Sequence, residues 1–190
     1  MRKDIMKSLK KSDWESEAPA LPVNAIKHKE QRVLVLFDVQ NLYHSAKNLY
    51  GARVNFSGIL KAAVAQRKLI RAFGYVVRTK TGEEKPFFEA LTKVGIETRV
   101  RDLQEFYGGL KKADWDVGIV IDAIRSAPHY DVICLCSGDG DFIPLMEYLE
   151  NQGKRTEVFA FGRSASAKLK EVVDEFVDLG ASPEIYLLKK

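Results

Sequence analysis

Short apolar runs alternate with amphipathic segments along most of the chain, and this alternation predicts the order of its secondary structure. Residues 33–37 and 132–136 are continuously apolar. Runs of this kind are typical of parallel strands that helices cover on both faces. Residues 96–101 alternate apolar and charged side chains, which indicates a strand near an edge of the sheet. The remaining predicted strands are 69–78, 155–161 and 176–179.

Segments with helical character separate these strands. We predict helices at 42–49, 58–66, 86–94, 142–152 and 164–175, and one that starts at 114. Ser57 and Asp114 are the expected N-caps of two of these helices. In the helix that Asp114 begins, the apolar residues that recur at the spacing of a core-facing stripe are Val117, Val120, Ile121 and Ile124. Strands that alternate with helices predict an α/β sandwich around a mostly parallel sheet.

The chain of 190 residues is long enough for one well-packed domain and an extension. Residues 1–30 mix charges and contain Pro19 and Pro22, so we expect an N-terminal arm or linker there. We expect the domain over 31–180 and a C-terminal tail over 181–190. The arm carries apolar residues that can pack on the domain or on a second subunit, so a homodimer is one expectation.

Composition and charge describe an ordinary soluble protein, with 46% hydrophobic and 29% charged residues. The net charge of +4 permits a polyanionic partner without requiring one. The sequence has no apolar stretch of the about 18 residues that a membrane span needs, and its basic N-terminus lacks the apolar segment of a secretory signal. We therefore expect no membrane partner and a cytoplasmic location. Cys134 and Cys136 share one face of a strand, which predicts reduced core thiols and neither a disulfide nor a zinc site.

Carboxylates follow two of the predicted strands at their carboxyl ends. Asp38 directly follows the first strand, and Asp139 and Asp141 follow the strand that contains both cysteines. Ligands of open α/β sheets bind outside these strand ends. Asp116 lies in the first turn of its helix, where the helix dipole favours a carboxylate. Asn41 adds a neutral amide three residues after Asp38.

Oxygen ligands without histidine or cysteine favour Mg²⁺ or Mn²⁺ over zinc. Such an ion neutralises a phosphate and lowers the pKa of a bound water, which is chemistry suited to phosphoryl transfer. Each acid also has a structural explanation: Asp38 as a helix cap, Asp116 as a partner of the helix dipole, and Asp139 with Asp141 as turn residues.

Three other uses of a Gly-Asp turn fit this sequence less well. A dinucleotide-binding loop needs a third glycine where this chain has Ile143, and its pyrophosphate would be repelled by two carboxylates. An EF-hand that starts at Asp139 would place Pro144 where the loop needs glycine. A phosphatase of the haloacid dehalogenase type needs a second Asp two residues after the first, where this chain has Gln40, so that interpretation is a minor alternative.

Four stretches carry a more specific signal: Phe-Asp-Val-Gln-Asn at 37–41, Lys-Ala-Asp-Trp-Asp-Val at 112–117, Ser-Gly-Asp-Gly-Asp-Phe at 137–142 and Gly-Lys-Arg at 153–155. In order and spacing they resemble the NYN domain family, the LabA-like branch of the PIN-like nuclease superfamily. The resemblance implies a PIN-like three-layer α/β/α sandwich and a metal-dependent nuclease that usually acts on RNA. It implies that Asn41 belongs to the catalytic site and that the metal-binding acids are Asp38, Asp116, Asp139 and Asp141. The family commonly has glycine after the first acid, and the side chain of Val39 is expected to narrow the approach to Asp38.

A polyanionic substrate needs basic residues near the acids. If the sheet is parallel, basic residues that follow its strands lie at the same edge as the acids. The predicted substrate-binding residues are Ser137 in the acidic turn and the basic residues Arg78, Arg101, Lys112 and Arg163. Tyr43, Phe106 or Tyr107 is expected to stack on a base, as in proteins that bind single strands.

The sequence thus predicts a Mg²⁺- or Mn²⁺-dependent ribonuclease, in which a metal-activated water hydrolyses phosphodiester bonds, with single-stranded RNA as the expected partner. Two alternatives stay open. One is a non-catalytic module of the same fold that binds RNA or a protein. The other is a phosphatase that uses the same acids on small substrates.

Overall fold

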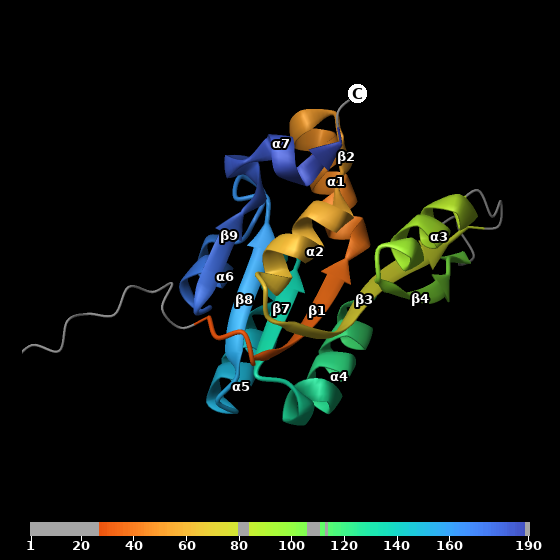
Figure 1. Ribbon diagram of the computed structural model, residues 1–190. Coiled ribbons are helices and arrows are strands. Elements are labelled where there is room, and N and C mark those ends of the chain that lie inside the picture. The colour runs from red at the N-terminus through yellow and green to blue at the C-terminus, as the bar shows by residue number, and fades with distance from the viewer. Residues whose placement is uncertain (1–26, 80–83, 106–110, 113, 189–190) are drawn as a thin grey trace, which may run out of the picture.

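The computed structural model describes residues 27–79, 84–105, 111–112 and 114–188. These residues form a six-stranded sheet in which every neighbouring pair of strands is parallel (Figure 1). From edge to edge the strands are β4 (Glu97–Asp102), β3 (Lys68–Arg78), β1 (Arg32–Asp38), β7 (Val132–Cys136), β8 (Arg155–Ala160) and β9 (Glu175–Asp178). The expected edge position of the strand at 96–101 is confirmed, since β4 ends the sheet.

Helices cover both faces of this sheet. One face carries α1 (Val39–Tyr50), α2 (Phe56–Val64) and α3 (Lys85–Lys93), and the other carries α4 (Asp116–Ser126), α5 (Ile143–Asn151) and α6 (Ala167–Glu171). Figure 1 shows α2 in front of the sheet and α4 with α5 behind it. Alternate residues of β1 enter the two cores, Val35 beneath α1 and α2 and Leu36 beneath α4 and α5. The predicted three-layer α/β/α sandwich around a mostly parallel sheet is therefore confirmed.

Several predicted helix starts are wrong, among them that of α1, which begins at Val39 and not at residue 42. The N-cap of α2 is Asn55 and not Ser57, because the Asn55 side-chain oxygen accepts a hydrogen bond from the Gly58 N–H at 3.1 Å. The helix expected to begin after Asp114 starts two residues later, at Asp116. The helix predicted at 164–175 is also much shorter, because α6 ends at Glu171 and the chain then enters β9.

The buried side of α4 differs from the predicted core stripe. Ile119 and Ala123 are the fully buried residues of this helix. The Trp115 indole N–H donates to the Val76 carbonyl oxygen at 2.9 Å, and this contact fixes the rotation of the helix that follows. The predicted core residues that the structure leaves exposed are Val117, Ile121 and Ile124. A tertiary contact of Trp115 therefore overrides the apolar periodicity.

The segment expected to be a C-terminal tail packs on the domain over most of its length. Residues Pro183–Tyr186 form α7, and β10 (Leu187–Leu188) pairs with β2 (Arg53–Val54) in an antiparallel ladder. The Asn55 side-chain amide donates to the Ile185 carbonyl oxygen at 2.8 Å. A second small antiparallel pair joins β5 (Gln104–Glu105) to β6 (Lys111–Lys112).

Cys134 and Cys136 are buried free thiols, as expected, and burial raises the pKa of both. Of the expected N-terminal arm, residues 1–26 lie outside the described part of the chain. None of the helices in the described ranges combines the length and apolar character that a membrane span requires.

Candidate metal centre

The two central strands end side by side at the carboxyl edge of the sheet. Phe37 of β1 aligns with Cys136 of β7, so Asp38 and Ser137 leave the sheet as neighbours. The Ser137 hydroxyl donates to a carboxylate oxygen of Asp38 at 3.0 Å and accepts a hydrogen bond from the Asp139 N–H at 3.3 Å. A buried hydroxyl therefore links the first acid to the turn that carries the other two.

Asn41 makes a second connection between these strand ends. The other carboxylate oxygen of Asp38 accepts a hydrogen bond from the Asn41 N–H at 3.0 Å, which caps α1. The Asn41 side-chain oxygen accepts one from the Gly138 N–H, also at 3.0 Å. A Cβ at Gly138 would lie 3.0 Å from the Ala165 Cα, so a larger residue would require Ala165 to shift by a few tenths of an ångström. The Asp-x-x-Asn and Gly-Asp motifs thus form one hydrogen-bonded unit.

Three carboxylates gather beyond this unit. Asp116, at the start of α4, and Asp139 and Asp141, in the turn after β7, offer carboxylate oxygens that all lie within 4.8 Å of one another. A carboxylate oxygen of Asp139 also accepts a hydrogen bond from the Asp141 N–H at 3.0 Å, which orients both residues. Opposite ligands of Mg²⁺ are about 4 Å apart. Small side-chain rotations are therefore enough for the three acids to share one ion.

Asp38 is outside this group of three, but it lines a cavity together with two of them, Asp116 and Asp139. That cavity has a volume of about 250 Å³. Its walls include Asp38, Asn41, Asp116 and Asp139, which the sequence predicted as site residues, and also Gln40, His44, Asp114 and Trp115. These four additional residues were not predicted as site residues. They lie close in sequence to the predicted acids, and only this closeness could have pointed to them.

The pKa of Asp38 is raised above its ordinary value. Burial is the largest cause, and the negative charges of Asp116 and Asp139 add to it, against the hydrogen bonds from Asn41 and Ser137. Burial and neighbouring like charges both disfavour an ionised carboxylate. A divalent cation in the cavity relieves both effects, and the oxygen-only donor set fits Mg²⁺ or Mn²⁺.

Arg101 is the predicted substrate-binding residue that lies beside the acidic cavity. Its guanidinium lies 4.5 Å from the centre of the Trp115 ring and donates to the Asp114 carbonyl oxygen at 2.6 Å. Arg78 is at the end of β3, where it pairs with Asp102 at 2.7 Å on an exposed surface. The structure thus places a cation at the rim of the cavity and a second, already paired, further along the same edge.

The structure describes the other predicted substrate-binding residues to different extents. Arg163 is exposed in the turn after β8. Ser137 is fully buried, so its hydroxyl holds Asp38 and the turn and has no exposed surface. Lys112 lies on β6, whose side chains are outside the described part of the structure, as are Phe106 and Tyr107 altogether.

Val39, the first residue of α1, is mostly buried. Its side chain is 5% exposed and belongs to the core beneath α1. It is not among the described residues that line the acidic cavity. Val39 instead lines a neighbouring cavity that shares Gln40 and His44 with the acidic one, so the expected narrowing of the approach to Asp38 stays a prediction.

A parallel α/β sandwich with carboxylates gathered beside the ends of its central strands is the arrangement that the sequence led us to expect of a nuclease-like domain. A model of the NYN domain matches residues 32–180, and the chain belongs to this family. It is similar to the low amplitude and bright protein LabA of Synechococcus elongatus, with 29% identity over 118 residues that cover 59% of this chain and 63% of LabA. The fold is similar to that of a protein of unknown function from Vibrio parahaemolyticus, with a TM-score of 0.77 and 29% identity over 85% of this chain and 99% of that chain.

Proposed function

We propose that this protein is a Mg²⁺- or Mn²⁺-dependent ribonuclease that hydrolyses phosphodiester bonds of single-stranded RNA in the cytoplasm. The observation that carries the proposal is the group of carboxylate oxygens of Asp116, Asp139 and Asp141, all within 4.8 Å of one another in an NYN domain. Oxygen donors of this kind bind the divalent cations that assist phosphoryl chemistry.

The acids and their supports have separate roles in this proposal. Asp116, Asp139 and Asp141 hold the ion, and Asp38 forms the adjoining wall of the cavity. When bound, the ion neutralises phosphate charge and lowers the pKa of water. Ser137 and Asn41 keep the acids in register through hydrogen bonds of 3.0 Å to Asp38 and to the Gly138 N–H.

The cationic residues at this edge support a polyanionic substrate. Arg101 lies at the rim of the acidic cavity, where it is held by Trp115 and by the Asp114 carbonyl oxygen. Arg163 is exposed after β8, and Arg78 and Lys112 complete the proposed set. Phosphate contacts of this type depend on salt, so the affinity for RNA should fall as ionic strength rises.

The proposal is tested by incubating labelled single-stranded RNA with the protein in Mn²⁺ or in EDTA. Cleavage is expected in Mn²⁺ and not in EDTA, and Asp139→Asn should abolish it. Glu150→Gln is the matched control, because it removes one exposed carboxylate charge at the far end of α5. Cleavage that survives in Asp139→Asn would overturn the proposal. RNA binding without cleavage would instead favour a non-catalytic module, and phosphate release from small esters alone would favour a phosphatase.

Metal binding is tested separately by thermal unfolding. A ligand at 100 times its dissociation constant stabilises a protein by about 2.7 kcal/mol. Saturating Mn²⁺ should therefore raise the unfolding temperature of wild type and of Glu150→Gln, and leave Asp139→Asn unchanged. An equal rise in all three proteins would place the ion elsewhere.

A further inference from the structure

An apolar groove adjoins the acidic cavity on the α1 side. Two cavities of about 380 and 420 Å³ lie between α1 and α3. The first shares Gln40 and His44 with the acidic cavity, and the two share Tyr43 and Phe87 with each other. We call this continuous surface the aromatic groove and define it by Tyr43, His44, Phe56, Phe87 and Phe88. Each volume lies within the roughly 300–1,000 Å³ of ordinary ligand pockets.

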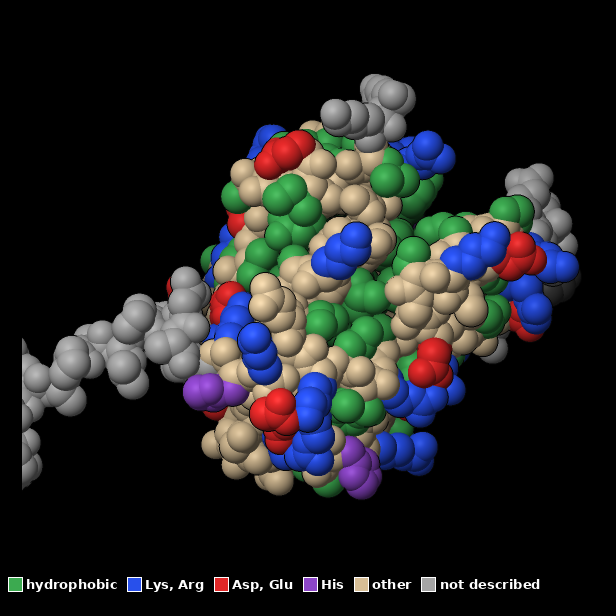
Figure 2. Space-filling view, viewed as in Figure 1, with side chains coloured by type: hydrophobic (Ala, Val, Ile, Leu, Met, Phe, Trp, Pro, Cys, Tyr) green, Lys and Arg blue, Asp and Glu red, His purple; other side chains and the backbone are tan. Residues whose placement is uncertain are grey.

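Ring contacts organise this groove. The Phe87 ring lies 5.7 Å from that of Phe56 and 6.1 Å from that of Phe88, and the rings of Tyr43 and His44 are 5.4 Å apart. Phe87 and Tyr43 are nevertheless 38% and 43% exposed. Figure 2 shows hydrophobic side chains gathered in the hollow between the α2 and α3 parts of the molecule. Aromatic surface is therefore available to a ligand within the groove.

Charged groups beside the rings indicate what kind of ligand fits. The Lys47 ammonium lies 5.7 Å from the centre of the Tyr43 ring, and Arg53 lines the second cavity. Glu84 lines the first cavity, and among the described residues its buried carboxylate oxygen Oε2 has no hydrogen-bond partner. Cations next to aromatic rings suit a ligand with phosphates and bases, and a carboxylate oxygen can accept from the amino group of a base. An apolar peptide would offer these charged groups no additional partner.

We propose that the aromatic groove stacks unpaired bases of a single-stranded nucleic acid, next to the nucleotide whose phosphate lies at the acids. This proposal rests on the proposed nuclease function and adds to it a binding subsite for the bases of the substrate. The shared residues Gln40 and His44 make the two subsites adjacent, as neighbouring nucleotides require. In a duplex the bases are already stacked and paired, so the groove selects single strands.

The first experiment measures the affinity of a short labelled single-stranded RNA by fluorescence anisotropy. All proteins carry Asp139→Asn, so that the RNA stays intact, and all are measured in Mn²⁺. Phe87→Ala and Tyr43→Ala should each weaken binding by about 5- to 150-fold, the range for one stacked base. Phe87→Tyr keeps a ring and should bind normally. Ile70→Ala should also bind normally, because it shortens an exposed apolar side chain near the amino end of β3, at the opposite end of the sheet from the acids.

The second experiment removes bases from the RNA instead of rings from the protein. An abasic nucleotide at the stacking position should weaken binding to the protein with Phe87 intact, and should have no further effect in Phe87→Ala. Equal weakening of intact and abasic RNA by Phe87→Ala would overturn the proposal. So would a change in oligomeric state of the groove variants with unchanged RNA affinity, which would assign the groove to a protein interface.

The two proposals fail in different ways. If the protein cleaves RNA in Mn²⁺ while Phe87→Ala and Tyr43→Ala bind and cleave like wild type, the groove proposal is overturned and the nuclease proposal stands. If binding depends on the base and on Phe87 but the protein never cleaves, the groove proposal stands and the nuclease proposal is overturned.

Discussion

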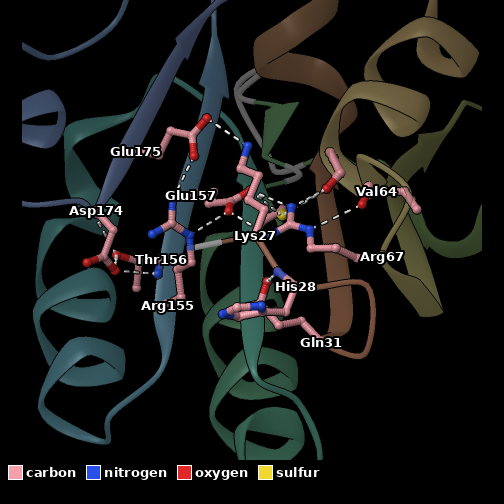
Figure 3. A network of polar contacts seen from close by, with 12 residues as sticks. Lys27, His28, Gln31, Val64, Arg67, Arg155, Thr156, Glu157, Asp174 and Glu175 are labelled. Carbon is pink, nitrogen blue, oxygen red and sulfur yellow. Dashed lines mark hydrogen bonds and ion pairs between the residues drawn. The ribbon is translucent and has the colours of Figure 1, made fainter. Parts of the chain in front are cut away.

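Replacing Arg67 with methionine should destabilise the protein severely, because Arg67 belongs to a buried ion pair. Its side chain is 1% exposed and that of its partner Glu157 is 0% exposed. The guanidinium donates to both carboxylate oxygens at 2.7 Å and to the carbonyl oxygens of Ala63 and Val64 (Figure 3). Methionine fills similar space without charge, so Glu157 stays buried with fewer partners.

The size of the loss follows from what remains around Glu157. Breaking one side of a buried ion pair costs about 3–5 kcal/mol. Arg155 still donates to Glu157 at 2.8 Å, and the Cys134 thiol lies 3.5 Å from its other oxygen. We therefore expect Arg67→Met to lower the free energy of unfolding by about 3 kcal/mol, at the lower end of this range. Adding Glu157→Gln should recover part of the loss, because it removes the stranded charge.

Urea unfolding at pH 7 measures this loss. The matched control is Lys68→Met, which removes the neighbouring residue's ion pair with Glu30, where the side chains are 55% and 80% exposed. Exposed pairs of this kind contribute about 0–1 kcal/mol. If Arg67→Met costs no more than Lys68→Met, the buried pair does not hold the fold as argued.

A second check is how the difference in free energy of unfolding between wild type and Arg67→Met depends on pH. In wild type, burial raises the pKa of Glu157, but hydrogen bonds from Arg67 and Arg155 outweigh it and leave the pKa below its ordinary value. This stabilisation is present above the unfolded-state pKa of about 4.3 and is lost as pH falls through the folded-state pKa. In Arg67→Met, fewer hydrogen bonds oppose the effect of burial, so the pKa of Glu157 should rise. Protonation of Glu157 then removes its buried charge as pH falls, and the variant loses less stability. The difference between the two proteins should therefore shrink from pH 7 towards pH 4, and a constant difference would refute the electrostatic explanation.

Three further substitutions test the geometry around the acids. Gly118→Ala should lower the melting temperature, although alanine is ordinarily the better helix former, because its Cβ would lie 2.4 Å from the Trp115 ring; a higher melting temperature would contradict this. Ser137→Ala should lower the free energy of unfolding in urea by about 1.5–3 kcal/mol, because Asp38 loses a charge-assisted hydrogen bond; an unchanged midpoint would show that the bond contributes nothing. Asp139→Asn should raise the melting temperature in EDTA, because it removes one of three clustered like charges; a lower temperature would mean that repulsion is not dominant.

The parts of the fold that the sequence predicts are those that depend on local pattern. β1 and β7 are covered on both faces, and burial on both faces produces the continuous apolar runs that mark them. The position of Asp38 and Asp139 at one edge follows once these strands are parallel neighbours. Both inferences need only the order of residues along the chain and the topology of an α/β sheet.

The parts that were not predicted depend on contacts between distant residues. The phase of α4 is set by Trp115 and its bond to the Val76 carbonyl oxygen, which periodicity within the helix does not contain. The pairing of β10 with β2 joins two-residue strands that are far apart in the sequence. Strands this short carry no hydrophobic pattern of their own. The aromatic groove was also not predicted, because Tyr43 and Phe87 come to line one cavity only when α1 and α3 pack on the same face of the sheet.

The sheet uses charge in opposite ways at its two ends. Towards the amino ends of the strands, Glu157 lies between Arg67 and Arg155, so burial of its charge is compensated (Figure 3). At the carboxyl ends, burial raises the pKa of Asp38, and the negative charges of Asp116 and Asp139 add to this effect. A fold optimised for stability alone has no reason to collect like charges where it has Ser and Asn to hold them in place. Proteins generally pair their buried charges, and a site that departs from this pattern is expected where side chains are selected for their chemistry. This contrast supports our proposal that the acidic end of the sheet is the functional one, while the paired end supplies stability that lets the fold tolerate it.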